Sequence, residues 1–267
     1  MRVSAAERTM NYVVLVLFAL FALAPILTIL ATAVSPQIGD PAGLHPGNFV
    51  EAWQVGGFGR SLGNSLIVAA IVVTAAVTLS VLSGYAFGTM RFRGSTVLFY
   101  VFLLGLMIPT EATVIPLFFD LRSLGLTDTY AAIALPQIAQ SVAFGTFWLR
   151  AQFRTLPVSL LEAAALDGAG PVRSLRSVVV PASVPALTTL LVLVFMWTWN
   201  EFLIALVMAP GGNLRTAPLG LSNFQGQYTA ELALLSAGAV IVALPMVIMF
   251  LFLQRHFIRG MLEGAVK

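Results

Sequence analysis

The stretch Leu-Pro-Val-Ser-Leu-Leu-Glu-Ala-Ala-Ala-Leu-Asp-Gly-Ala-Gly-Pro occupies residues 156–171, and it continues through two arginines to Val-Val-Val-Pro at residues 178–181. It is the longest segment between two hydrophobic blocks that is also rich in arginine. In a chain that is apolar almost everywhere else, we expect this segment to be a docking surface on the cytoplasmic side of a membrane.

Local chemistry predicts a helix, a glycine turn and a second helix here. The spacing from Ser159 to Glu162 is that of a capping box, and three alanines at residues 163–165 favour continuation of the helix. Gly168 and Gly170 permit a left-handed turn, and Pro171 can open a second short helix. These features alone also fit a plain capped connection between two membrane spans.

Composition predicts an integral membrane protein. Hydrophobic residues make up 59% of the chain and charged residues 9%, against about 25% charged in soluble domains. The apolar blocks have the length of about 20 residues that a helix needs to cross a bilayer, and the ten-residue alternation of barrel strands is missing. We predict an all-α fold with a single domain, residues 1–267, and six spans at residues 12–34, 65–90, 96–118, 130–147, 184–208 and 232–253.

Two of these spans carry further expectations. The run 12–34 has a competing interpretation as a signal peptide, but it exceeds the roughly 7–15 residues of a signal core, which favours a retained span. The second span ends in Gly-Tyr-Ala-Phe-Gly, residues 84–88, whose small residues permit close packing of helices.

The basic residues predict the orientation. Six spans place both termini, the loop after the second span and the loop 150–182 on one side. That side holds eleven of the fourteen basic residues: Arg2, Arg8, Arg91, Arg93, Arg150, Arg154, Arg173, Arg176, Arg255, Arg259 and Lys267. The other side holds Arg60, Arg122 and Arg215. Because cytoplasmic loops are enriched in Lys and Arg, we expect both termini and the loop 150–182 to be cytoplasmic.

The same loop resembles a known family motif. Glu162-Ala163-Ala164, then Gly168 after three residues, then Val178-x-Val180-Pro181 after nine more, resembles the EAA loop of ABC importer permeases. The usual ending of that loop is Ile-x-Leu-Pro, and both valines keep its apolar character. Asp167 beside Gly168, the segments at residues 48–53, 64–66 and 199–202, and the C-terminal residues 254–267 resemble the carbohydrate-type branch, which includes the smaller maltose-permease subunit.

The resemblance implies a type I permease fold with a coupling helix between spans four and five, and a role in solute import by alternating access. It implies a dimer of ABC ATPases that binds ATP and Mg²⁺, a second and related permease subunit, and an extracytoplasmic solute-binding protein. It also implies the cytoplasmic membrane of a bacterium or archaeon. The residues it assigns to ATPase coupling are Glu162, Ala163, Ala164, Asp167, Gly168 and Pro181.

Polar residues inside or near the spans are candidates for the translocation pathway, because ionisable and amide side chains are costly in lipid and usually face a cavity. These candidates are Asn64, Glu111, Gln137, Gln140, Asn200 and Glu201. Five of them have a second interpretation, which is solvent exposure at a span end for Glu111 and hydrogen bonding between helices for the glutamines, Asn200 and Glu201.

Several catalytic and binding motifs are missing from the sequence, and their absence limits the functions that the chain can have. A P-loop needs a lysine after its second glycine, but the single lysine is Lys267 at the last position. The chain has no cysteine and no clustered metal ligands, and its basic residues flank spans and do not form a nucleic-acid face. We therefore predict a non-enzyme with no cofactor of its own. A proton-coupled secondary transporter using Glu111 or Glu201, and a membrane scaffold without a pathway, stay as alternatives.

Overall fold

The computed structural model describes the backbone of residues 5–225 and 231–265, and the side chains of residues 7–225 and 231–254. The predicted C-terminal signature therefore lies almost entirely outside the described side chains, as does Arg2. The regular elements of the described part are helices, and no β-strand occurs in it. The predicted all-α class is confirmed.

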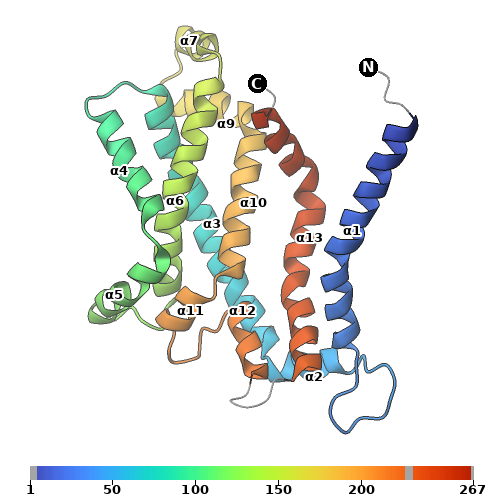
Figure 1. Ribbon diagram of the computed structural model, residues 1–267. Coiled ribbons are helices and arrows are strands. Elements are labelled where there is room, and N and C mark those ends of the chain that lie inside the picture. The colour runs from blue at the N-terminus through green and yellow to red at the C-terminus, as the bar shows by residue number, and fades with distance from the viewer. Residues whose placement is uncertain (1–4, 226–230, 266–267) are drawn as a thin grey trace. The chain divides into compact units, whose positions relative to one another are not determined.

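Helices long and apolar enough to cross a membrane account for four of the predicted spans (Figure 1). They are α1 (Ala5–Ala33), α3 (Phe58–Thr89), α6 (Tyr130–Thr155) and α13 (Leu232–Ala265). Residues 7–31 of α1 are exposed throughout, as expected of a helix whose apolar surface faces lipid or another protein.

The two other predicted spans are bent or divided. α4 (Ser95–Met107) and α5 (Thr110–Ser123) meet at 97° and occupy the segment predicted as one span at 96–118. The segment Pro171–Ala182 meets α10 (Val184–Asn200) at 82°, and α11 (Leu203–Met208) follows α10 after a break. The described residues thus hold up to six spans if each bent pair is counted as one.

The chain divides into two compact units. The first comprises residues 1–59 and 220–245, and the second comprises residues 60–219 and 246–267. In the first unit, Phe58 and Phe224 are buried with ring centroids 6.2 Å apart, and Phe224 belongs to the short helix η2 (Leu221–Phe224). Gly238 of α13 permits this packing, because a Cβ there would lie 3.0 Å from the Phe224 ring.

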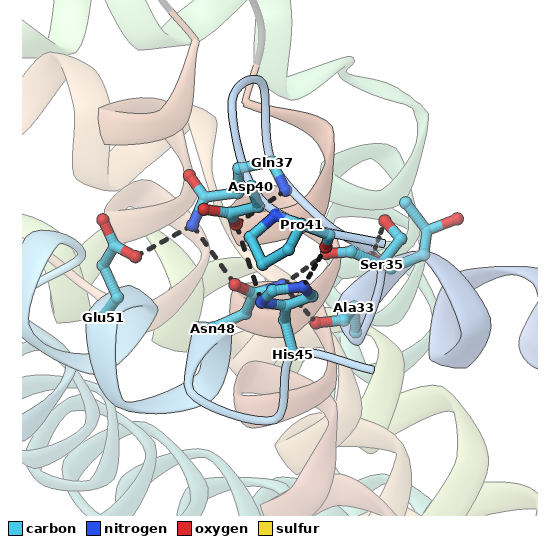
Figure 2. Close-up of polar contacts among 9 residues, drawn as sticks. Ala33, Ser35, Gln37, Asp40, Pro41, His45, Asn48 and Glu51 are labelled. Carbon is cyan, nitrogen blue, oxygen red and sulfur yellow. Dashed lines mark hydrogen bonds and ion pairs between the residues drawn. The ribbon is translucent and has the colours of Figure 1, made fainter. Parts of the chain in front are cut away.

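A polar network closes the loop between α1 and α2 (Asn48–Val55) in the first unit (Figure 2). Asn48 is buried, and its Nδ2 donates to the carbonyls of Ala33 at 3.1 Å and Ser35 at 2.8 Å. Gln37 donates through Nε2 to Asn48 Oδ1 and to Glu51 Oε2. Because a buried amide that satisfies two carbonyls is costly to remove, Asn48 fixes the path of the chain leaving α1.

In the second unit, α3 packs against α6 through glycine. A Cβ on Gly84 would lie 2.8 Å from Leu149 Cβ and 3.2 Å from the backbone nitrogen of Arg150. Gly88 makes a similar approach to Phe153. The prediction of close packing by the small residues 84–88 is confirmed.

A π-helical turn connects the loop after α6 to α10. The segment η1 (Leu175–Val179) follows α8 (Pro171–Ser174) and precedes α9 (Val180–Ala182). The N–H of Val180 donates to the carbonyl of Leu175, five residues earlier, as in a π-helix. Both Leu175 and Val179 are buried, so the wide turn is packed into the unit.

Candidate functional site

The bend between α4 and α5 is the first part of the site. α4 ends at Met107, Ile108 and Pro109 are extended, and α5 begins at Thr110. Pro109 has no N–H and disfavours the helical conformation at Ile108, which explains why the helix stops. Inside an apolar layer, a non-helical backbone is tolerated only where protein or water surrounds it. The bend is therefore a natural place for a cavity.

A cavity of about 260 Å³ lies at this bend, between α4, α5, α6 and α10 of the second unit. Its apolar lining comes from the end of α4, from Ile108 after it, and from two aromatic rings, Phe144 and Trp197. Its polar lining consists of Thr110, Gln137, Gln140, Ser141, Thr198 and Glu201. The cavity thus combines amides, hydroxyls and one carboxylate with an aromatic wall.

The two glutamines are held in different ways. Gln140 donates through Nε2 to the hydroxyl of Thr110 at 2.7 Å, which ties α6 to the first residue of α5. Gln137 is buried, and its Nε2 donates to the carbonyl of Ile133 on its own helix at 2.9 Å. Both side chains are therefore oriented before any ligand arrives.

Glu201 stands where α10 stops. Its backbone is extended, and its Oε1 accepts a hydrogen bond of 2.8 Å from the backbone N–H of Ile204 in the first turn of α11. A carboxylate at a helix N-terminus is stabilised by the helix dipole and by the N–H groups that have no partner within the helix. Glu201 therefore shapes the cavity wall by starting α11.

The aromatic wall is built by contacts between α6 and α10. The Phe144 and Trp197 rings lie 4.9 Å apart with an interplanar angle of 81°, an edge-to-face arrangement. Trp148 stacks on Phe144 with ring centroids 6.2 Å apart, and it donates through Nε1 to the carbonyl of Ala186 at 3.0 Å. This bracing holds a flat apolar surface beside the polar groups.

Three of the six predicted pathway residues lie outside this cavity. Asn64 donates to the carbonyl of Arg215 at 2.9 Å and accepts from the Tyr130 hydroxyl at 2.8 Å. Glu111 is exposed in the first turn of α5. Asn200 is exposed and donates to the carbonyl of Met196 at 2.8 Å.

The predicted docking segment has the expected architecture. α7 (Val158–Leu166) is followed by Gly168 with φ +75°, and α8 begins at Pro171. The N–H of Ala169 donates to the carbonyl of Ala164 at 2.9 Å, and the N–H of Gly168 donates to the carbonyl of Ala165 at 3.0 Å. These two bonds form a Schellman motif, which ends a helix at a left-handed residue. The predicted helix, glycine turn and helix are confirmed.

The predicted capping box is wrong. Pro157 occupies the cap position, and no side chain caps α7, so Ser159 lies within the first turn. The extended backbone of Pro157 turns the chain into the helix, and Leu160 N–H donates to the Pro157 carbonyl at 3.0 Å. Glu162 consequently lies past the first turn, where the helix dipole has little effect on it.

The docking segment presents both polar and apolar side chains. The residues expected to couple to an ATPase are exposed except for Ala164: Glu162, Ala163, Asp167, Gly168 and Pro181. Beside them, Val158 is 67% exposed and Leu166 is 90% exposed. Large apolar side chains on a polar rim are typical of a surface that another protein covers.

The residues between 76 and 263 match the family model described as "Binding-protein-dependent transport system inner membrane component". The chain belongs to this family. Members are permeases, that is, membrane components of transport systems, and this chain is a multi-pass membrane protein of that kind. Both the helix–glycine–helix segment and the cavity lie within the matched residues.

Similar permeases are named for several solutes. The chain is 33% identical to the trehalose transport system permease protein SugB of Mycobacterium tuberculosis, over 92% of this chain and 93% of that protein. It is 36% identical to the trehalose/maltose permease protein MalG of Thermococcus litoralis, over 79% of this chain and 76% of that one. The sn-glycerol-3-phosphate permease protein UgpE of Pectobacterium atrosepticum is 33% identical over 82% and 80%.

Solved structures share the permease fold. A chain of a bacterial ABC transporter involved in the import of alginate superposes with a TM-score of 0.80 at 23% identity, covering 96% of this chain and 99% of that one. A second alginate transporter structure, described in complex with a pentasaccharide-bound periplasmic protein, has a TM-score of 0.70 at 17% identity and covers 92% and 91%.

Some cavity residues of this permease were not predicted from the sequence. Ser141 and Phe144 follow Gln137 and Gln140 on α6 at helical spacing, so residues 137, 140, 141 and 144 share one face. Trp197 and Thr198 precede Glu201 by about one turn of α10. These residues could have been found in the sequence by counting helical turns from the predicted glutamines and from Glu201. Thr110 could not be found that way, since it enters the cavity only because the chain bends before it.

Proposed function

We propose that this chain is the permease subunit of an ATP-driven importer for a sugar, an oligosaccharide or a polyol. Its six spans form one transmembrane domain of residues 1–267. The observation that carries the solute class is the cavity at the α4–α5 bend. The names of similar permeases, which include trehalose, maltose and arabinooligosaccharide systems, support the same class.

The lining chemistry suits a polyhydroxylated solute. A sugar presents hydroxyl groups around its rim, each able to donate and accept, and a less polar face of C–H groups. The amides of Gln137 and Gln140, the hydroxyls of Ser141 and Thr198 and the carboxylate of Glu201 offer both donors and acceptors. Trp197 offers an apolar plane for the C–H face.

The size of the cavity supports a shared site. Pockets that enclose a ligand have volumes of about 300–1,000 Å³, and this cavity is about 260 Å³. A related second permease would supply the remaining wall, with Asn64, Glu111 and Asn200 as further candidates along the pathway. Alternating access would then open this shared site to each side in turn.

Coupling to ATP is assigned to α7 and its glycine turn. Glu162, Ala163, Ala164, Asp167, Gly168 and Pro181 would form the surface that an ABC ATPase dimer grips, and ATP and Mg²⁺ would be bound by the ATPases and not by this chain. A closing ATPase can shift the permease only through contacts that differ between its two conformations. The exposed face of α7 supports this assignment.

The orientation follows from the distribution of charge. Eleven basic residues on one side against three on the other favour a cytoplasmic α7 and cytoplasmic termini, in the inner membrane of a bacterium or archaeon. An extracytoplasmic solute-binding protein would deliver the solute to the opposite side.

The test is reconstitution of the chain with its ATPase, its partner permease and its binding protein in vesicles. Uptake of labelled trehalose, maltose or glycerol is measured with ATP inside, and the Gln137→Leu, Gln140→Leu double variant is compared with the wild type. We expect uptake that needs ATP and the binding protein and that falls at least tenfold in the variant. Uptake without ATP that collapses with the proton gradient would instead favour a secondary transporter.

A further inference from the structure

A second cavity of the second unit has a different chemistry. It has a volume of about 180 Å³ and lies between the end of α3, the start of α4 and the end of α6. Three arginines, Arg91, Arg150 and Arg154, and two hydroxyl side chains, Ser95 and Thr96, line it beside apolar residues. No carboxylate lines this cavity, so its chemistry is that of an anion site.

Arg150 is fixed in position before any anion binds. Its Nε donates to the carbonyl of Phe87 at 3.2 Å, and its guanidinium carbon lies 3.7 Å from the centre of the buried Phe99 ring. In the described part of the chain, its two Nη groups have no hydrogen-bond partner. Because a guanidinium matches two phosphate oxygens with two parallel N–H groups, Arg150 is preset for a phosphate.

The start of α4 adds a second anion-binding element. α4 has 13 residues, and Gly94 before it has φ +81°, with no side chain capping the helix. Ser95 and Thr96 of its first turn line the cavity. The N–H of Ser95 donates to the carbonyl of Phe92 at 3.3 Å, but the next N–H groups of a first turn have no partner within the helix and favour negative charge. The N-terminus of α4 therefore adds to the attraction that the arginines exert on an anion in the cavity.

The sequence segments that line the cavity contain no acidic residue. The sequence has no Asp or Glu between Glu51 and Glu111, and none between Asp128 and Glu162. These two acid-free stretches include all the residues that line the cavity. No carboxylate among the lining residues offsets the three arginines, so the cavity favours an external anion.

An apolar stripe starts within one residue of the cavity. Val97, Val101 and Leu104 recur on one face of α4 and are 67%, 56% and 57% exposed. An occupant that satisfies the whole surface needs an anionic head and long apolar tails. A free phosphate ion has only the first, and an acidic loop of a protein lacks the second.

We propose that the cavity of Arg91, Arg150 and Arg154 binds the phosphate of an anionic phospholipid, whose acyl chains lie along the exposed α4 stripe. Arg150 and Arg154 grip the phosphate oxygens, the first turn of α4 accepts the remaining charge, and Arg91 closes the site. Basic pockets between transmembrane helices are known binding places for anionic headgroups on the cytoplasmic side. The bound lipid thereby holds the start of α4 and the end of α6 together at the level of the headgroups.

The test measures lipids bound to the purified transporter by native mass spectrometry, with phosphatidylglycerol and phosphatidylcholine offered in equal amounts. We expect wild type to retain phosphatidylglycerol with at least a tenfold preference. Each arginine near a membrane surface contributes about fivefold to anionic lipid binding. The double variant Arg150→Gln, Arg154→Gln should therefore lose about 25-fold, whereas Arg173→Gln, Arg176→Gln, with the same loss of charge, should keep the preference.

Single variants test whether a loss of lipid binding in the double variant is caused by misfolding. Arg91→Gln changes a loop residue that lines the cavity, and Arg93→Gln changes a neighbour that does not. We expect the first to weaken phosphatidylglycerol binding several-fold and the second to leave it unchanged. An equal effect of the two variants, or no headgroup preference in wild type, would overturn the proposal.

Two further results would assign the cavity to another occupant. Displacement of the bound lipid by millimolar inorganic phosphate would point to a free anion as the natural ligand. Retention of lipid by the isolated permease but not by the assembled transporter would point to an acidic partner surface. Either result contradicts the lipid assignment.

Discussion

The side-chain amide of Gln140 on α6 donates a hydrogen bond of 2.7 Å to the hydroxyl of Thr110, the first residue after the α4–α5 bend. The continuous helix α6 is thus connected to α5, which begins directly after the bend that ends α4. The pair lies in the cavity wall, so it connects the geometry of the bend with the chemistry of the site.

We expect Gln140→Leu to lower the rate of solute uptake about tenfold, since the loss of a polar cavity group adds to the loss of a hydrogen bond of about 1 kcal/mol. Thr110→Val should reduce uptake as well. If the two residues act through their mutual bond, the double variant is little worse than either single variant. The measurement is ATP-driven uptake in vesicles, normalised to assembled complex. Strictly additive losses would argue against a shared role.

We expect Gly168→Arg and Gly168→Val to abolish solute-stimulated ATP hydrolysis while leaving membrane insertion intact. Gly168 has φ +75°, where a β-branched side chain is strongly disfavoured. Gly168→Asn should retain part of the activity, because asparagine tolerates this conformation. Gly170→Ala is the matched control, since Gly170 has φ −69° and open space around it. Normal uptake by the Gly168→Arg variant would remove α7 from the coupling mechanism.

We expect Gly84→Leu to destabilise the second unit by about 1–3 kcal/mol, the usual cost of overpacking. A Cβ at this position already lies 2.8 Å from Leu149 Cβ, and a larger side chain must force α3 and α6 apart. Gly63→Ala, in the same helix but in open space, should be neutral or slightly stabilising. Thermal unfolding of the purified protein compares the two. Equal melting temperatures would show that the contact is loose.

We expect Asn48→Ala to loosen the chain that leaves α1, because the carbonyls of Ala33 and Ser35 lose their shared donor. Leaving such groups unsatisfied costs about 1–3 kcal/mol. Limited proteolysis should then cut residues 36–46 several-fold faster. Gln37→Ala removes contacts that are more exposed and should have a smaller effect. The reverse order of cleavage rates would place the anchor at Gln37.

Sequence reasoning predicted best where local chemistry decides the structure. The turn at Gly168 needs only a glycine after an alanine helix and a proline at residue 171, and all three are visible in the sequence. The capping box was wrong because Pro157 and Ser159 both favour a helix N-terminus, and the structure uses the proline at the cap position.

The cavity was predicted only in part, because its shape depends on tertiary structure. Gln137, Gln140 and Glu201 were singled out by their polarity inside apolar segments, and the structure places all three in the wall of one cavity. Asn64 has the same polarity, but Arg215 and Tyr130 use its side chain to hold a loop, and a sequence alone does not reveal such distant partners. The sequence also did not decide whether the helix ends at Pro109, since a proline within a membrane helix can either kink the helix or end it.

Because of the π-helical turn at Leu175–Val179, adding or removing a single residue between α7 and α10 would change how the following helices are oriented. A wide turn holds one residue more than an α-helical turn would. Deleting that residue would rotate the following helix by about 100° about its axis. Trp197, Thr198 and Glu201 would then leave the cavity wall together. The helix–glycine–helix segment and the cavity wall are thus held in phase by a single surplus residue, and a deletion there would disrupt the cavity although no residue of its lining is changed.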